Sequence, residues 1–155
     1  MKTLNSDDLS NMAQYFRDIS LEQMKTKGKL QAELKDLVDN GASANNINAK
    51  QQDILETNTR ITQNIQEAQR LDAQAIKNIL VSTNSVDAIS KITDAKNKVL
   101  EAIKEIADVR RTLQYVDLFI RIAGAIIGAA TTTTPPAQID ATIKAINLLY
   151  DADFG

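Results

Sequence analysis

The chain has 155 residues, 18 basic and 20 acidic side chains, and neither Cys nor His. These absences exclude disulfides, thiolate or imidazole metal sites, and catalysis by a Ser-His-Asp or Cys-His group. The near balance of charge, with a formal net charge of −2, gives no general attraction for nucleic acid, and we predict a protein that is not an enzyme, with no cofactor, no metal and no small-molecule substrate.

Apolar residues recur at spacings of three and four between polar breaks, which predicts an all-α chain. The length suits one domain, so we expect residues 1–155 to form a single helical bundle. Asp7 and Asp8 stand where a secretory signal would be apolar, so we expect a cytoplasmic protein, or one exported without a cleaved signal peptide. The predicted helices span about 7–40, 45–81, 86–130 and 135–150.

The first predicted helix has a weak middle. Gln23 and Thr26 occupy positions on its otherwise apolar stripe, and Gly28 follows within a run of lysines. Glycine inside a helix costs about 1 kcal/mol relative to alanine, which favours a kink or a frayed turn there. An anion site at Lys25, Lys27 and Lys29 is less favoured than a solvated face. Asn40-Gly41 is typical of a helix end.

The second predicted helix carries a coiled-coil-like heptad of Ile47, Ile54 and Ile61. The companion row, four residues further on, includes the polar residues Gln51, Asn58 and Asp72. Two interpretations stay open. These residues form polar layers in the core, which would fix the register, or they lie at a rim in contact with water.

The third predicted helix has an unbroken stripe from Val99 to Ala130 and would be of order 65 Å long. Short breaks make neighbouring helices antiparallel. The prediction is therefore an elongated antiparallel bundle of three long helices, with a short fourth helix that turns back from beside the Gly41 loop. We expect Glu101, Glu105 and Asp108 to lie on a salt-bridged solvent face.

One segment stands out because no charged residue occurs between Ile122 and Ile139. Gly124 and Gly128 lie on one helix face and would allow another backbone to approach closely. Three interpretations remain: burial on several sides within the bundle, an exposed patch that docks a partner, or insertion into a membrane. A long helical stalk with an apolar hairpin at one end resembles the architecture of the α-helical pore-forming toxins.

We therefore predict a non-enzymatic interaction or assembly protein that associates through apolar helix faces, especially the hairpin at 118–149. Its partner would be another protein or further copies of itself, and not nucleic acid. The alternative is a membrane-active protein, like a pore-forming-toxin component, whose C-terminal hairpin enters lipid. The residues expected to contact a partner or lipid are Phe119, Ile122, Gly124, Ile126, Ile127, Gly128, Ile143 and Leu149.

Overall fold

The computed structural model describes the backbone of residues 2–4, 6–74, 79–81, 85–131 and 137–155, and the side chains of 6–73, 89–126 and 138–155. The described chain is helical, as predicted, but it has five helices rather than four. In chain order they are α1 (Ser6–Asp39), α2 (Ala44–Gln74), α3 (Ser85–Glu105), α4 (Val109–Thr131) and α5 (Ala137–Phe154).

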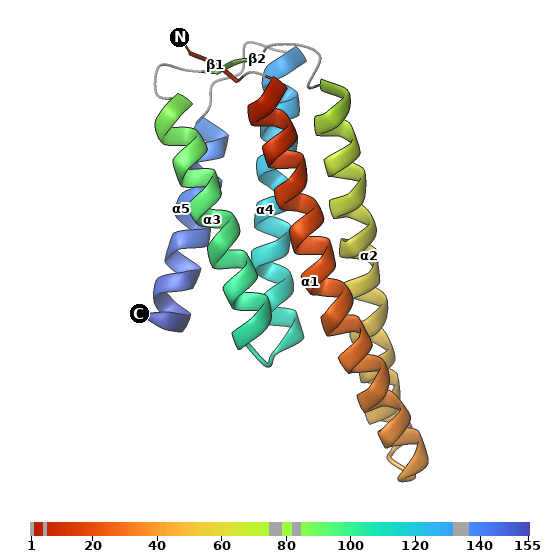
Figure 1. Ribbon diagram of the computed structural model, residues 1–155. Helices are drawn as coiled ribbons and strands as arrows, with labels where there is room; N and C mark the ends of the chain where they lie inside the picture. The colour runs from red at the N-terminus through yellow and green to blue at the C-terminus, as the bar shows by residue number, and fades with distance from the viewer. Residues whose placement is uncertain (1, 5, 75–78, 82–84, 132–136) are drawn as a thin grey trace.

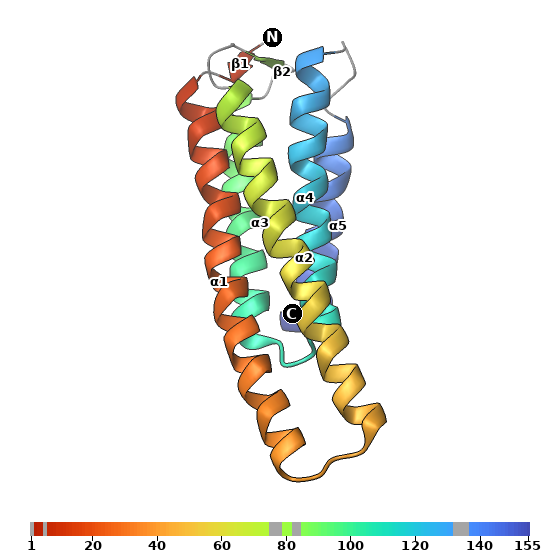
Figure 2. The same cartoon turned by 90° about the vertical axis from the view of Figure 1, so that its right-hand side faces the viewer.

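The helices lie side by side, and each reverses the direction of the one before it (Figure 1). The α1 helix packs along α2 and α3, α2 packs along α4, and α5 packs against both α3 and α4. The α1–α2 hairpin extends well beyond the turn that joins α3 to α4, as both views show (Figures 1 and 2).

The predicted end of the first helix at Gly41 is confirmed. Gly41 has a φ of 68°, a left-handed conformation that glycine adopts without steric cost. The Ala42 amide donates to the Leu37 carbonyl at 2.9 Å, and the Gly41 amide donates to the Val38 carbonyl at 3.2 Å. These two bonds form a Schellman motif, which satisfies carbonyls that the helix leaves free. The helix runs without interruption through Gly28, so the frayed turn expected there is wrong.

The single long helix predicted at 86–130 is also wrong, because residues 106–108 break it into α3 and α4. Asp108 caps the new helix, since its carboxylate accepts a 3.0 Å hydrogen bond from the Arg110 amide. The apolar stripe continues across the break because α3 and α4 both direct their apolar face toward the same core. The end of α4 therefore lies at the opposite end of the molecule from Gly41 (Figure 1), and not beside it as expected.

Two three-residue strands pair near the chain start. β1 (Lys2–Leu4) lies antiparallel to β2 (Ile79–Val81), with Thr3 opposite Leu80. The predicted second helix reached residue 81, so its last three residues are strand instead. The ribbon lies at the end of the molecule where α1 begins (Figure 1).

A mostly aliphatic core joins all five helices, and it lies around the half of α1 that is nearer the N-terminus. Phe16 and Phe119 are both buried in this core, with ring centroids 4.7 Å apart. On α5, Ile139, Ile143 and Ile146 recur at spacings of four and three and are all buried. The helix runs to Phe154, four residues beyond the end predicted for it at residue 150.

Candidate functional site

The structure places four of the eight predicted contact residues inside the chain's own core. Phe119, Ile122 and Ile126 have no exposed surface, and Ile143 is 4% exposed. Leu149 is partly buried and packs against the same core. The geometry therefore fits the interpretation in which neighbouring helices bury this segment, and these side chains would reach a partner only if α4 and α5 left that core.

The structure shows no close helix approach at Gly124, the one of the two predicted glycines whose surroundings it describes. Gly124 is exposed, and a Cβ added there would meet nothing within 4 Å. The side chain of Ile127 and the surroundings of Gly128 lie outside the described residues. At Gly124 the space is open, and no neighbouring helix among the described residues approaches it.

The α1–α2 hairpin divides into two parts that differ in their surroundings. We call residues 6–23 and 61–73 the embedded half, because they contribute many buried side chains to the core. We call residues 24–60 the distal hairpin. Within it only Leu30 and Thr57 are buried. The distal hairpin extends past the α3–α4 turn, and beyond that turn no third helix lies against it among the described residues (Figure 2).

The apolar seam between α1 and α2 continues from the embedded half into the distal hairpin. Beyond the α3–α4 turn, no third helix among the described residues packs against it. Leu34 and Leu37 follow Leu30 at spacings of four and three, and Ile54 and Ile47 precede Ile61 at spacings of seven. Leu34, Leu37, Ile47 and Ile54 are all only partly buried. Two helices alone cannot bury such a seam, so the distal hairpin presents an open apolar side.

A cleft of about 460 Å³ marks the place where the α3–α4 turn meets the distal hairpin. Its apolar lining includes Leu30, Ile103, Ile106 and Val109. Its walls carry charges of both signs, with four lysines and five acids: Lys25, Lys29, Lys50 and Lys104, with Glu22, Glu33, Asp53, Glu105 and Asp108. Glu33 and Lys50 form an ion pair across the hairpin at 2.7 Å.

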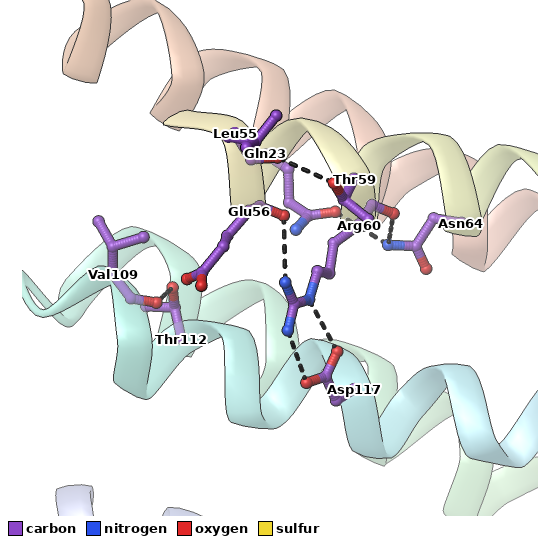
Figure 3. Close-up of polar contacts among 9 residues, drawn as sticks. All are labelled: Gln23, Leu55, Glu56, Thr59, Arg60, Asn64, Val109, Thr112 and Asp117. Carbon is purple, nitrogen blue, oxygen red and sulfur yellow. Dashed lines mark hydrogen bonds and ion pairs between the residues drawn. The ribbon is translucent and has the colours of Figure 1, made fainter. Parts of the chain in front are cut away.

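Three buried polar residues lie along α1 and α2 where the two halves of the hairpin meet, and we call them the polar layer. Gln23, Thr57 and Asn64 are at most 2% exposed. The Asn64 amide nitrogen donates to the Gln23 side-chain oxygen at 2.9 Å and to the Arg60 carbonyl at 3.0 Å (Figure 3). The sequence correctly places Gln23 on the stripe.

The polar rows of α2 are not the ones expected. Gln51 and Asn58 are exposed, and Asp72 is partly exposed and pairs with Arg17. These residues therefore lie at the rim. The buried polar row lies three residues, not four, after the heptad positions Ile54 and Ile61, because α2 also packs against α4. That row carries Thr57 and Asn64, which the sequence analysis missed.

Arg60 ties α2 to α4 beside this layer. Its guanidinium binds both carboxylate oxygens of Asp117, at 3.0 and 3.2 Å, and also donates to the Glu56 carbonyl (Figure 3). The hydrogen bond to Asp117 raises the pKa of Arg60 above its ordinary value, against the opposing effect of burial. This bidentate pair holds α2 to α4 at the boundary between the two halves of the hairpin.

A second polar cluster holds the end of α5 to α4. The Arg111 guanidinium binds the two carboxylate oxygens of Asp153 at 2.9 and 3.1 Å, and the buried Tyr115 hydroxyl donates to Asp153 at 2.6 Å. The hydrogen bonds from Arg111 and Tyr115 hold the pKa of Asp153 below its ordinary value. Burial, followed by the bond to Asp153, raises the pKa of Tyr115. Every strong partner of this cluster is internal, so the cluster has a structural role.

The other candidate groups separate in space or find partners. Glu101 accepts a 2.7 Å hydrogen bond from Tyr150, while Glu105 lines the cleft. Lys25 pairs with Glu22, and Lys27 donates to Asn58. Within the described residues, no group of three or more acidic side chains is placed to hold a metal ion.

None of the helices, over the residues that the structure describes, combines the length and the apolar character needed to cross a bilayer. Comparisons of the chain with protein-family models, with curated proteins and with solved structures find no match.

Proposed function

We propose that the protein is a non-enzymatic assembly protein that associates with further copies of itself through the open side of the distal hairpin. The single observation that supports this proposal is that one apolar seam is buried beside the α3–α4 turn and becomes partly exposed beyond it. Leu30 is 3% exposed beside the α3–α4 turn, whereas Leu34 and Leu37, on the same face, are only partly buried. Burying apolar surface contributes about 25 cal/mol per Å², which favours covering this seam.

A second copy is a suitable cover because of the shape of the hairpin. Two distal hairpins related by a twofold axis would place the same surface of each chain against the other. Each copy would supply the pair of helices that the other lacks beyond its α3–α4 turn. The product would be a four-helix arrangement, in which each seam is covered on both sides.

The charges around the seam fit this pairing. The cleft walls mix four lysines with five acids, so two copies of the surface do not repel each other strongly. Glu33 and Lys50 lie on opposite helices of the hairpin. In an antiparallel pairing, each can meet its opposite charge on the other copy.

The experiment is sedimentation velocity of the wild-type chain over a range of concentrations. We expect a concentration-dependent dimer, and we expect Leu37→Asp to weaken it at least about tenfold, because a charge in the seam loses about 1.4 kcal/mol or more of binding. The matched control is Leu148→Asp on α5. Leu148 is 61% exposed and lies outside the seam. Circular dichroism checks that both variants keep their helix content.

Two results would overturn the proposal. The wild-type chain could stay monomeric at every concentration, or Leu148→Asp could weaken the dimer as much as Leu37→Asp. Because the chain has no cysteine, a Leu37→Cys variant adds a second test. Oxidation should link two copies through this position and not through Leu148→Cys.

The membrane-active alternative has less support from the geometry. Ile122 and Ile126 would have to leave a core in which neither has any exposed surface. Flotation with anionic phospholipid vesicles tests it. Binding that Ile126→Asp abolishes, with no effect of Leu37→Asp, would favour the lipid function over self-association.

A further inference from the structure

The boundary between the embedded half and the distal hairpin is a distinct structural feature. On α1, the buried residues run from Leu9 to Gln23 at close spacing, and on α2 they run from Ile61 to Leu71. Across the 24–60 segment between them, only Leu30 and Thr57 are buried. The distal hairpin is therefore joined to a well-packed region by an abrupt loss of apolar contacts.

The polar layer lies at this boundary. The Gln23 side-chain nitrogen, the Thr57 hydroxyl and the Asn64 side-chain oxygen are buried and have no hydrogen-bond partner among the described residues. The one bond between Gln23 and Asn64 uses the remaining oxygen and nitrogen of the two amides. Each layer residue therefore carries one buried polar atom without a protein partner.

Such atoms change the balance between a closed and an opened hairpin. A buried polar group without a partner destabilises the closed state, because it has lost its hydrogen bonds to water. Any motion that admits water to the layer restores those bonds. Opening is therefore less costly at this layer than it would be at an apolar layer of the same size.

The contacts on the two sides of the layer make the opening local. On the core side of the layer, the Phe16–Phe119 contact holds the embedded half, and the bidentate Arg60–Asp117 pair joins α2 to α4 between Thr57 and Asn64. Below it, the ion pair between Asp53 and Arg110 is long, at 3.8 Å, and the cleft separates the hairpin from the α3–α4 turn.

We propose that the polar layer of Gln23, Thr57 and Asn64 is a built-in opening point. The distal hairpin separates there from the α3–α4 turn while the core stays folded. The opened state exposes Leu30, Ile103 and Ile106, which line the cleft in the closed state. The inference concerns the single chain, so it does not depend on the proposed self-association.

Hydrogen exchange of the dilute monomer tests the opening. After correction for intrinsic rates, we expect central amides of the distal hairpin to exchange at least about tenfold faster than those of the embedded half. Their exchange should depend weakly on denaturant, because a local opening exposes little surface. The amides of α3, α4 and α5 should exchange as slowly as those of the embedded half.

Three variants test whether the layer causes the opening. Thr57→Val removes a buried hydroxyl and keeps the side-chain shape, and the pair Gln23→Leu with Asn64→Leu replaces both amides with apolar groups. Each should slow exchange in the distal hairpin, by about tenfold for the double variant. The matched control is Thr62→Val. Thr62 is exposed on the same helix, so this change should leave the exchange rates as they are.

The proposal fails on any of three results. The distal amides could exchange with the rates and the denaturant dependence of the embedded half. The layer variants could leave distal exchange unchanged. The variants could also slow exchange equally in every helix, which would mean that the layer affects global stability and not a local opening.

Discussion

The embedded half and the distal hairpin belong to the same two helices but have different surroundings. In the embedded half, α1 and α2 pack against α3 and α4 around Phe16 and Phe119. In the distal hairpin the same seam continues, and partly buried leucines and isoleucines replace the buried ones. The difference shows that helix length and burial are set independently. The hairpin keeps the apolar spacing of a helix beyond the point where α3 and α4 stop packing against it.

The largest expected effect is on the core. Phe119→Ala should lower the free energy of unfolding by about 3–5 kcal/mol, because it removes a fully buried ring. Leu34→Ala in the distal hairpin should cost only about 1 kcal/mol, since that side chain is already partly exposed. Denaturant unfolding followed by circular dichroism measures both. Equal losses would remove the distinction between the two halves.

The next effect concerns the link between α2 and α4. Arg60→Gln and Asp117→Asn, measured singly and together in unfolding experiments, should give a coupling energy of about 1 kcal/mol. The value is modest because water reaches both side chains, which are 24% and 41% exposed. A coupling near zero would mean that the pair does not help to hold α2 to α4.

A smaller effect is expected at the two exposed helical glycines. Gly28→Ala and Gly124→Ala should each raise helix stability by about 0.5–1 kcal/mol, because neither Cβ would meet a neighbour within 4 Å. Gly28→Ala should slow amide exchange only in the distal hairpin, and Gly124→Ala should act on α4. An effect of Gly28→Ala that spreads over all helices would contradict the separation of the two regions.

The smallest effect is a pH dependence at the end of α5, outside both halves. The folded pKa of Asp153 lies below its ordinary value of 3.8. The stabilisation is therefore present above pH 3.8 and is lost as the pH falls through the folded pKa. The raised pKa of Tyr115 acts in the other direction. Its contribution is present below pH 10 and is lost as the pH rises further.

Melting temperatures across this pH range test both groups. The difference between wild type and Asp153→Asn should be constant at neutral pH and shrink below pH 3.8. The difference from Tyr115→Phe should shrink above pH 10. A difference that stays the same at every pH would show that these bonds contribute no linked protonation.

The sequence predicts the helices where apolar spacing and end signals agree. Gly41 ends α1 because a left-handed residue is needed there, and Ile139, Ile143 and Ile146 face the core as their spacing indicates. The break at 106–108 was not predictable from spacing, because the stripe remains in phase across it. Asp108, which caps α4, is the residue that could have signalled it.

The candidate site was less predictable than the helices. The segment from Phe119 to Ile126 is unusually apolar, but apolar character does not tell a buried helix from a docking surface. The break at 106–108 explains why this segment is buried, since it reverses the chain and lets α4 pack back into the core. The open seam carries no such signal, because Leu34 and Leu37 have the same spacing whether or not a third helix covers them.

The most direct test of the central claim compares hydrogen exchange of the wild-type chain at low and at high concentration. If copies associate through the distal hairpin, amides around Leu30, Leu37 and Ile54 should gain protection at high concentration, while those of α4 and α5 keep theirs. No gain in the distal hairpin, or a gain confined to residues 118–149, would contradict the account.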